Sequence, residues 1–148
     1  MDSRLYQVLE FDKVLKRIAK FAATKSGKEQ ILALRPTTQL DEAVRWQKET
    51  QEGVQVLQRK GPPPFGGIFP LHSLLKRAEI GSLLQPHELL QVASTLRATR
   101  QMKRFFNSIQ EEGLGEYPLL RPWVEALTPD RQLEEAIHNW HKENKGNF

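Results

Sequence analysis

The chain has 148 residues, the length of one domain, and 22 basic against 18 acidic side chains give a net charge of +4. This near balance excludes a histone-like or tail-type nucleic-acid binder but permits anionic partners. The absence of cysteine excludes disulfide frameworks and thiolate zinc sites. The amino terminus lacks the apolar core of a signal peptide, and no apolar run approaches the roughly 20 residues of a membrane span. We therefore expect a cytoplasmic protein with no membrane contact.

Apolar residues recur at helical spacing, and this pattern predicts a single all-α domain over residues 1–148 with about six or seven helices and no sheet. The first helix has an apolar face over residues 11–22 and a basic face opposite it. The basic residues are Lys13, Lys16, Arg17 and Lys20. Because a charge run opposite an apolar stripe is usually the solvated side, we assign this face no function.

A second helix is predicted within residues 26–36, with Ser26 as its N-cap and Pro36 beyond its end. Its Gly27-Lys28 pair lacks the earlier glycine and the following hydroxyl of a phosphate-binding loop. A third helix is predicted from near Thr38 to about Lys60. Its expected buried stripe consists of Leu40, Ala43, Val44, Val54 and Leu57.

The stretch GPPPFGGIFP, residues 61–70, predicts a rigid joint rather than a phosphate-binding loop or a flexible linker. Three prolines stiffen the chain, and the two glycines that follow allow left-handed backbone angles. A phosphate-binding loop would require the glycines to follow a strand and to open a helix. The residues predicted to form the joint are Pro64, Phe65, Gly66 and Gly67. We expect Phe65, Ile68 and Phe69 to anchor it in the core, and exposed contact residues are the alternative.

A fourth helix over residues 71–80 is expected to end at Gly81, and Pro86 begins a long helix that runs to about Gln110. The long helix has two apolar faces, which differ by a rotation of roughly 140°. The first face holds Leu89, Val92, Ala93 and Leu96, and the second holds Met102, Phe105, Phe106 and Ile109. The buried side of this helix is therefore predicted to change midway.

An arginine row, Arg97, Arg100 and Arg104, continues the line of the first face, with Lys103 at its edge. The arginine stems could lie over the core while their heads stay in water. Alternatively, the guanidinium groups could bind phosphates or carboxylates of a partner. A third alternative is pairing within the chain with Glu111, Glu112 and Glu116. These four basic residues are the candidate nucleic-acid or partner contacts.

Residues 118–127 form a short segment, and a last helix is predicted with Thr128 as its cap and Pro129 at its first position. Residues 141–148 are expected to form a loose polar tail. His138 and His141 lie near two glutamates in the sequence, but a metal site would need three well-placed ligands. We predict no catalytic, cofactor-binding or metal-binding residue in this chain.

Five segments carry a resemblance to a known family: LEFDKVLKRIA (9–19), GKEQIL (27–32), PPFGG (63–67), LLKRAEIGSLLQPHELL (74–90) and RQMKRF (100–105). Over about residues 5–137 the chain resembles the amino-terminal region of MutS-two, the second bacterial branch of the MutS family. The resemblance implies a helical, MutS core-like fold. In the family, lever and clamp helices, a dimeric ATPase domain that uses ATP and Mg²⁺, and a small MutS-related nuclease domain follow this region. The closing HKENKGNF departs from the family pattern.

The resemblance implies a cytosolic homodimeric ATPase and endonuclease that binds branched DNA, restrains recombination and, in some bacteria, engages collided ribosomes. None of the family's catalytic motifs can be assigned to residues of this chain. The leading hypothesis is therefore a non-catalytic scaffold that supports the levers of a MutS-two protein. In one alternative, the arginine row binds nucleic-acid backbone directly. In the other, the chain provides a protein interface for the lever or for the other copy in the dimer.

Overall fold

A computed structural model describes residues 10–145, which contain seven helices and no strand. This confirms the predicted all-α class. The chain divides into two compact units, residues 1–37 and residues 38–148. Each unit is described by itself below, and the single domain over residues 1–148 stays a prediction.

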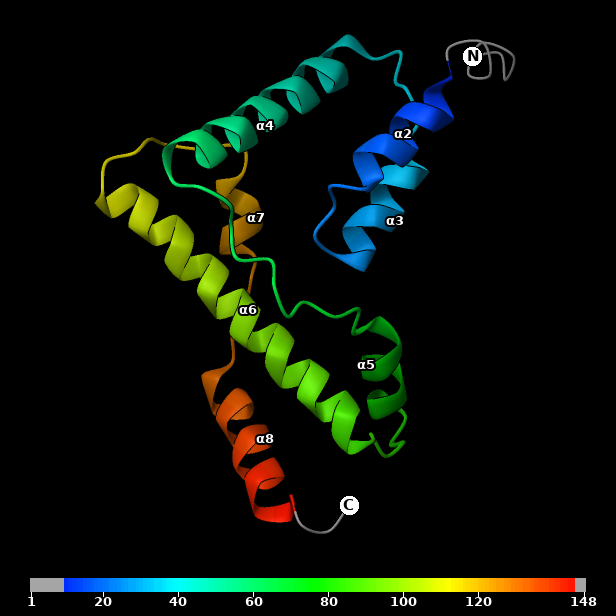
Figure 1. Ribbon diagram of the computed structural model, residues 1–148, viewed down its shortest axis with the longest axis vertical. Coiled ribbons are helices and arrows are strands. Elements are labelled where there is room, and N and C mark those ends of the chain that lie inside the picture. Colours follow the sequence, from blue (N-terminus) through cyan, green and yellow to red (C-terminus); the bar gives the residue numbers. More distant parts are fainter. Residues whose placement is uncertain (1–9, 146–148) are drawn as a thin grey trace. The chain divides into compact units, whose positions relative to one another are not determined.

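In the first unit, α2 (Phe11–Ala19) and α3 (Lys25–Ala33) pack side by side (Figure 1). Leu15 and Ala19 of α2 are buried. The predicted apolar face of the first helix is only partly correct, because α2 ends at Ala19 and Phe21 is 89% exposed. The N-cap of α3 is Thr24 rather than Ser26, since its hydroxyl accepts a hydrogen bond from the Gly27 amide at 3.0 Å.

The second unit is built around α6, a helix of 26 residues (Figure 1). Its helices are α4 (Leu40–Arg59), α5 (His72–Glu79), α6 (Pro86–Glu111), α7 (Arg121–Glu125) and α8 (Arg131–Asn144). Both α7 and α8 pack against α6. Pro86 occupies the first turn of α6 and Gly81 has a left-handed φ of 77° after α5, so these two predicted boundaries are confirmed.

The buried side of α6 changes along its length, as predicted. In the first half, Val92 and the fully buried Ala93 pack with Ile137 of α8. In the second half, Ile109 packs with Val56 of α4 and with Tyr117, which follows α6. Two separate apolar clusters therefore form on different sides of one helix.

The predicted buried stripe of α4 is wrong. Leu40 is 76% exposed and Leu57 is 53% exposed, whereas Val56 is 1% exposed and belongs to the core. Adjacent helical residues differ in direction by about 100°, so burial of Val56 turns Leu57 away from the α6 cluster. The apolar seam that the sequence places in the core is therefore a surface of this unit.

The joint over residues 61–70 runs along α6 and is tied to it by two hydrogen bonds. Ser94 Oγ donates to the Gly67 carbonyl at 2.9 Å, and the Phe69 amide donates to Thr95 Oγ1 at 3.1 Å. Gly67 has a φ of 82°, and a Cβ atom there would lie 2.6 Å from Ser94 Oγ. Phe65 is 42% exposed and Phe69 40% exposed, so these rings are not the core anchors that we expected.

The last helix begins and ends later than predicted. Asp130 caps α8 by accepting a hydrogen bond from the Leu133 amide at 2.9 Å, in place of Thr128. The helix runs to Asn144, whose side chain donates to the Trp140 carbonyl at 2.8 Å. Residues 141–144 are therefore helical rather than part of a loose tail, and residues 146–148 lie outside the described residues.

An ion pair fixes the turn between α5 and α6. Arg77 donates to both carboxylate oxygens of Glu88, Nη1 at 2.6 Å and Nη2 at 3.0 Å. Glu88 also accepts the Gln85 amide at 2.8 Å, as the carboxylate of a capping box does. These hydrogen bonds, that of Arg77 first, lower the pKa of Glu88 to about 2.

We expect Ile109→Ala to destabilise the second unit by about 2–5 kcal/mol, because it opens a cavity at a side chain that is 1% exposed. Urea unfolding followed by tryptophan fluorescence measures this effect, since all three tryptophans lie after residue 38. Leu83→Ala is the control, because Leu83 is 90% exposed. Equal losses in the two variants would contradict the packing described here.

The pH dependence of stability tests the Arg77–Glu88 pair. A lowered pKa in the folded state means that Glu88 stabilises the fold above the ordinary glutamate pKa of about 4.3 and loses this effect as the pH falls toward 2. We therefore expect Glu88→Gln to lower the melting temperature at pH 7 and the difference from wild type to shrink between about pH 5 and pH 2. Glu79→Gln, an exposed position in α5, serves as control. A melting-temperature difference between Glu88→Gln and wild type that does not change with pH would contradict the lowered pKa of Glu88.

Candidate functional site

The central arginine of the predicted row, Arg100, is partly buried and pairs with a carboxylate of the same chain. Arg100 donates to the Glu134 carboxylate of α8 through Nε at 3.1 Å and Nη2 at 2.8 Å. Glu134 is 6% exposed, and the Arg100 hydrogen bond lowers its pKa while the same bond raises the pKa of Arg100. A two-pronged pair of this kind fixes both side chains. Arg100 is therefore part of the α6–α8 contact.

This intramolecular partner differs from those named from the sequence. The sequence suggested Glu111, Glu112 and Glu116, which follow one another along the chain. In the structure Glu112 pairs with Lys60 at the end of α4, and Arg100 pairs with a residue of the last helix. No local signal identifies Glu134, because the pair depends on where α8 packs.

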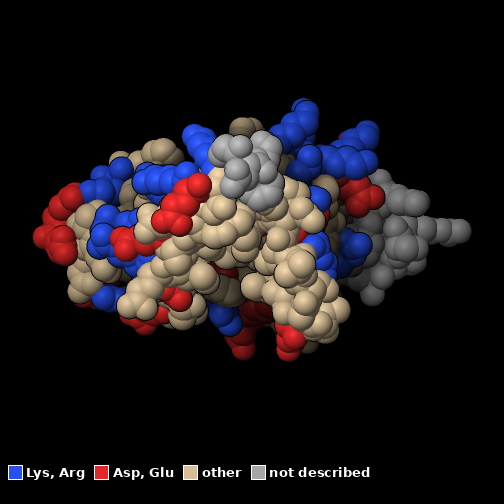
Figure 2. Space-filling model, turned by 90° about the horizontal axis from the view of Figure 1, so that it is seen from below, with Lys and Arg blue, Asp and Glu red and all other residues tan. Residues whose placement is uncertain are grey.

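Arg97 and Arg104 are exposed, and Lys103 is half-buried. The charge of Arg97 contributes to the low pKa of Glu134, so Arg97 lies on the side of α6 that faces α8. In the left part of Figure 2, basic and acidic side chains lie among each other rather than forming one basic surface. Contact of these three residues with nucleic acid or a protein partner stays a prediction.

An apolar groove lies between α4, the joint, α6 and α7. Its volume is about 690 Å³. Its walls include Val54 and Leu57 of α4, Phe65 of the joint, Met102 of α6 and Trp123 of α7. Trp123 is 64% exposed, so the groove opens to the surface. We call this surface the apolar groove.

The polar side chains in the apolar groove are already satisfied. Thr50 donates to the Trp46 carbonyl and Thr99 to the Thr95 carbonyl, at 2.8 and 2.9 Å. The remaining lining residues are apolar or glycine. This surface offers no acid, base or nucleophile, and it can bind by burying apolar area.

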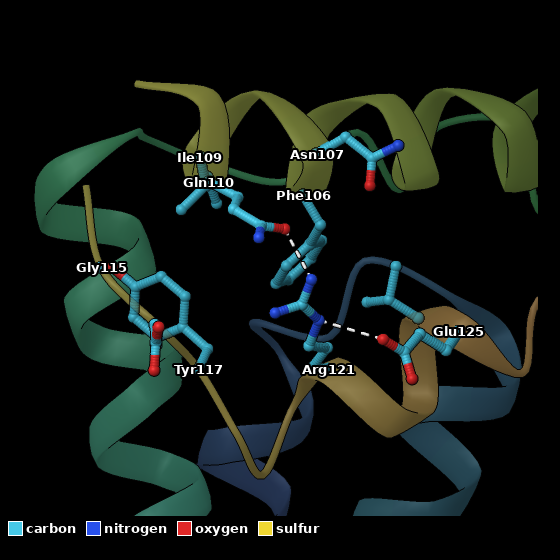
Figure 3. A pocket seen from close by; sticks show the side chains of 10 residues that line it. Phe106, Asn107, Ile109, Gln110, Gly115, Tyr117, Arg121 and Glu125 are labelled. Atoms are coloured by element: carbon cyan, nitrogen blue, oxygen red, sulfur yellow. Dashed lines mark hydrogen bonds and ion pairs between the residues drawn. The ribbon is translucent and has the colours of Figure 1, made fainter. Parts of the chain in front are cut away.

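A smaller pocket of about 70 Å³ lies between the second half of α6 and α7 (Figure 3). Arg121 bridges Gln110 and Glu125, at 2.5 and 3.0 Å (Figure 3). Nearby, Glu52 of α4 accepts the amides of Leu119 and Leu120, each within 3.0 Å of Oε2. These polar groups hold α4, α6 and α7 together, and no local sequence pattern indicates them.

The predicted lack of a metal site concerns His138 and His141. Within residues 10–145, no three histidine or acidic side chains are grouped as metal ligands. In the same part of the chain, no helix has the length and apolar character that a bilayer crossing requires.

Comparison with known proteins identifies the relatives of this chain. No family model matches it. A protein named endonuclease MutS2 from Geobacillus sp. (strain WCH70) is 42% identical over 137 residues, which are 93% of this chain and 17% of that protein. The chain is a homologue of part of the endonuclease MutS2 proteins. This confirms the predicted resemblance and is consistent with an amino-terminal region of MutS2.

Further MutS2 proteins give the same result. The relative from Bacillus cytotoxicus is 41% identical over 93% of this chain, and that from Halalkalibacterium halodurans is 40% identical over 90% of it. Each alignment covers 17% of the relative. The chain thus spans about one sixth of the length of the curated MutS2 relatives that it matches.

In this MutS2 homologue, substitution of the paired Arg100 should affect the melting temperature more than substitution of the exposed Arg104. Arg100→Gln leaves the buried Glu134 carboxylate without its cation, so we expect the melting temperature at pH 7 to fall by several degrees. Arg104→Gln, at an exposed position of the same helix, should change it little. Thermal melting followed by circular dichroism measures both, and a larger loss for Arg104→Gln would contradict the ion pair.

Proposed function

We propose that this chain is a non-catalytic helical scaffold of a MutS2-type protein and that its apolar groove docks another segment of that protein. The observation that carries the proposal is the groove itself, a volume of about 690 Å³ with satisfied polar groups and exposed apolar walls. Apolar grooves that open to the surface are typical sites of interaction. The relatives are about six times as long as this chain, and such a protein can supply the missing partner.

The pairing of Arg100 supports the scaffold over a purely nucleic-acid function of the arginine row. The Arg100 guanidinium uses Nε and Nη2 for Glu134, so its charge is already paired with a carboxylate of this chain. Arg100 and Glu134 instead fix α8 on α6. In this proposal the second unit has its structure before binding, and its apolar groove binds the lever helices.

The wider activities belong to the whole protein in this proposal. The relatives are named endonucleases, enzymes that cut nucleic acid, and we propose that this chain works within such a nucleic-acid enzyme in the cytoplasm. Nucleotide hydrolysis with ATP and Mg²⁺, nuclease cleavage and homodimer formation would reside in other parts of that protein. Restraint of recombination, binding of branched DNA and action on collided ribosomes would be functions of the assembled dimer.

Direct binding of nucleic-acid backbone by the arginine row is the second candidate function. The exposure of Arg97 and Arg104 favours it. If it is correct, their replacement by glutamine should weaken nucleic-acid binding and make its salt dependence shallower.

The docking proposal predicts a complex between this chain and a MutS2 relative from which the homologous segment has been removed. Val54→Asp with Leu57→Asp should weaken that complex at least about tenfold, because charges would be buried in an apolar contact. Both positions are about half exposed, at 45% and 53%, so the helix should stay folded. Analytical ultracentrifugation of the mixture measures the dissociation constant.

A matched variant controls for added charge. Ile80→Asp with Leu83→Asp replaces two apolar residues that are 80% and 90% exposed and lie outside the groove. This variant should bind as the wild type does. Equal weakening by both variants, or no complex with the unsubstituted chain, would overturn the proposed docking.

A further inference from the structure

The net positive charge of the chain is confined to its first unit. Residues 1–37 contain eight basic and four acidic residues, whereas residues 38–148 contain fourteen of each. The first unit therefore has a charge of +4, equal to that of the whole chain, and the second unit is neutral. The near balance of basic and acidic residues in the whole chain does not reveal this unequal charge of the two units.

The basic residues of α2 occupy one face. Lys13, Lys16, Arg17 and Lys20 follow the spacing i, i+3, i+4, i+7, which places them within about 100° around the helix. Lys20 is the C-cap and keeps helical backbone angles, so it continues this face. All four are exposed, on the side opposite the buried Leu15 and Ala19.

Acidic side chains leave most of this face unneutralised. Lys13 pairs with Glu10 at 2.6 Å, but Lys16, Arg17 and Lys20 make no ion pair among the described residues. In the second unit, six of the fourteen basic residues form ion pairs among the described residues, as Arg45 does with Glu49 and Arg131 with Glu135. The repulsion that remains on α2 is what an anionic partner would relieve.

Two further exposed lysines lie on α3, the helix that packs against α2. Lys25 and Lys28 stand in and next to its first turn, which contains no acidic residue. The helix dipole disfavours cations at this end, so helix stability does not account for their placement. Phe21, which is 89% exposed, follows directly after Lys20 and offers a ring on which an unpaired base can stack.

We propose that these exposed cations of the first unit, Lys16, Arg17, Lys20, Lys25 and Lys28, together bind the phosphate backbone of nucleic acid. The inference rests on the proposed function, because work within a nucleic-acid enzyme decides between nucleic acid and other polyanions. It moves the expected contact from α6 to α2 and α3. The docking experiment reports on the apolar groove and the binding experiment on α2 and α3, so failures of the two proposals can be distinguished.

Binding of this chain to a fluorescein-labelled oligonucleotide, as single strand and as duplex, tests the inference by fluorescence anisotropy between about 50 and 200 mM salt. Five phosphate contacts predict a slope of log K against log salt of about −4.5 for duplex. Lys16→Gln with Arg17→Gln and Lys20→Gln should reduce affinity at least about tenfold and make the slope shallower by about 2.7. Glutamine preserves helix propensity, and circular dichroism checks the fold.

The matched control removes three charges from α6 through Arg97→Gln, Lys103→Gln and Arg104→Gln. It should retain most of the affinity and the slope, whereas direct binding by the arginine row, the second candidate function, predicts the main loss in this variant. In addition, Phe21→Ala should weaken single-strand binding by about fivefold or more and duplex binding less. Greater loss in the α6 variant, salt-independent binding, or binding to phosphatidylcholine–phosphatidylserine vesicles without binding to the oligonucleotide would overturn the inference.

Discussion

The change of buried side along α6 is the constraint on which the second unit depends. A helix that presents Ala93 on one side and Ile109 on another, both almost inaccessible to solvent, needs neighbours on both sides. Helix α8 packs on the side of Ala93, and α4 packs with the segment around Tyr117 on the side of Ile109. Because α4 meets α6 through Val56, the neighbouring Val54 and Leu57 stay exposed and form a wall of the apolar groove. The groove is thus a consequence of how α6 distributes its contacts.

The features of α6 that are local in sequence were predictable. Its proline start, the glycine end of α5 and the two apolar faces all follow from spacing within one helix. The stripe of α4 was wrong because periodicity finds an apolar face without saying whether a neighbour covers it. The caps of α3 and α8 were misplaced by a few residues, since Ser26 competes with Thr24, and Thr128 with Asp130, for the same role.

The candidate site was less predictable than the fold for a related reason. The arginine row was visible from the sequence, but its partner Glu134 lies 34 residues further along and is brought to Arg100 by the packing of α8. The polar contacts of Glu52 and Arg121 also join distant segments. In contrast, the basic face of α2 is visible in the sequence. The division into units with charges of +4 and zero adds that the net charge of the chain lies in the unit that contains this face.

The Arg100–Glu134 pair fixes the arrangement of α6 and α8, as the proposed scaffold requires. Burying an ion pair yields little net stability relative to apolar packing, but removal of one partner is costly, so the pair mainly excludes alternative arrangements. It stands where the first apolar face of α6 ends, and one turn of sliding by α8 would separate the two groups. The Arg100–Glu134 pair therefore fixes the position of α8 on α6, as the Arg77–Glu88 pair fixes the turn between α5 and α6. In the proposed nucleic-acid contact, attraction of the partner falls to the first unit, where Lys16, Arg17 and Lys20 make no ion pair among the described residues.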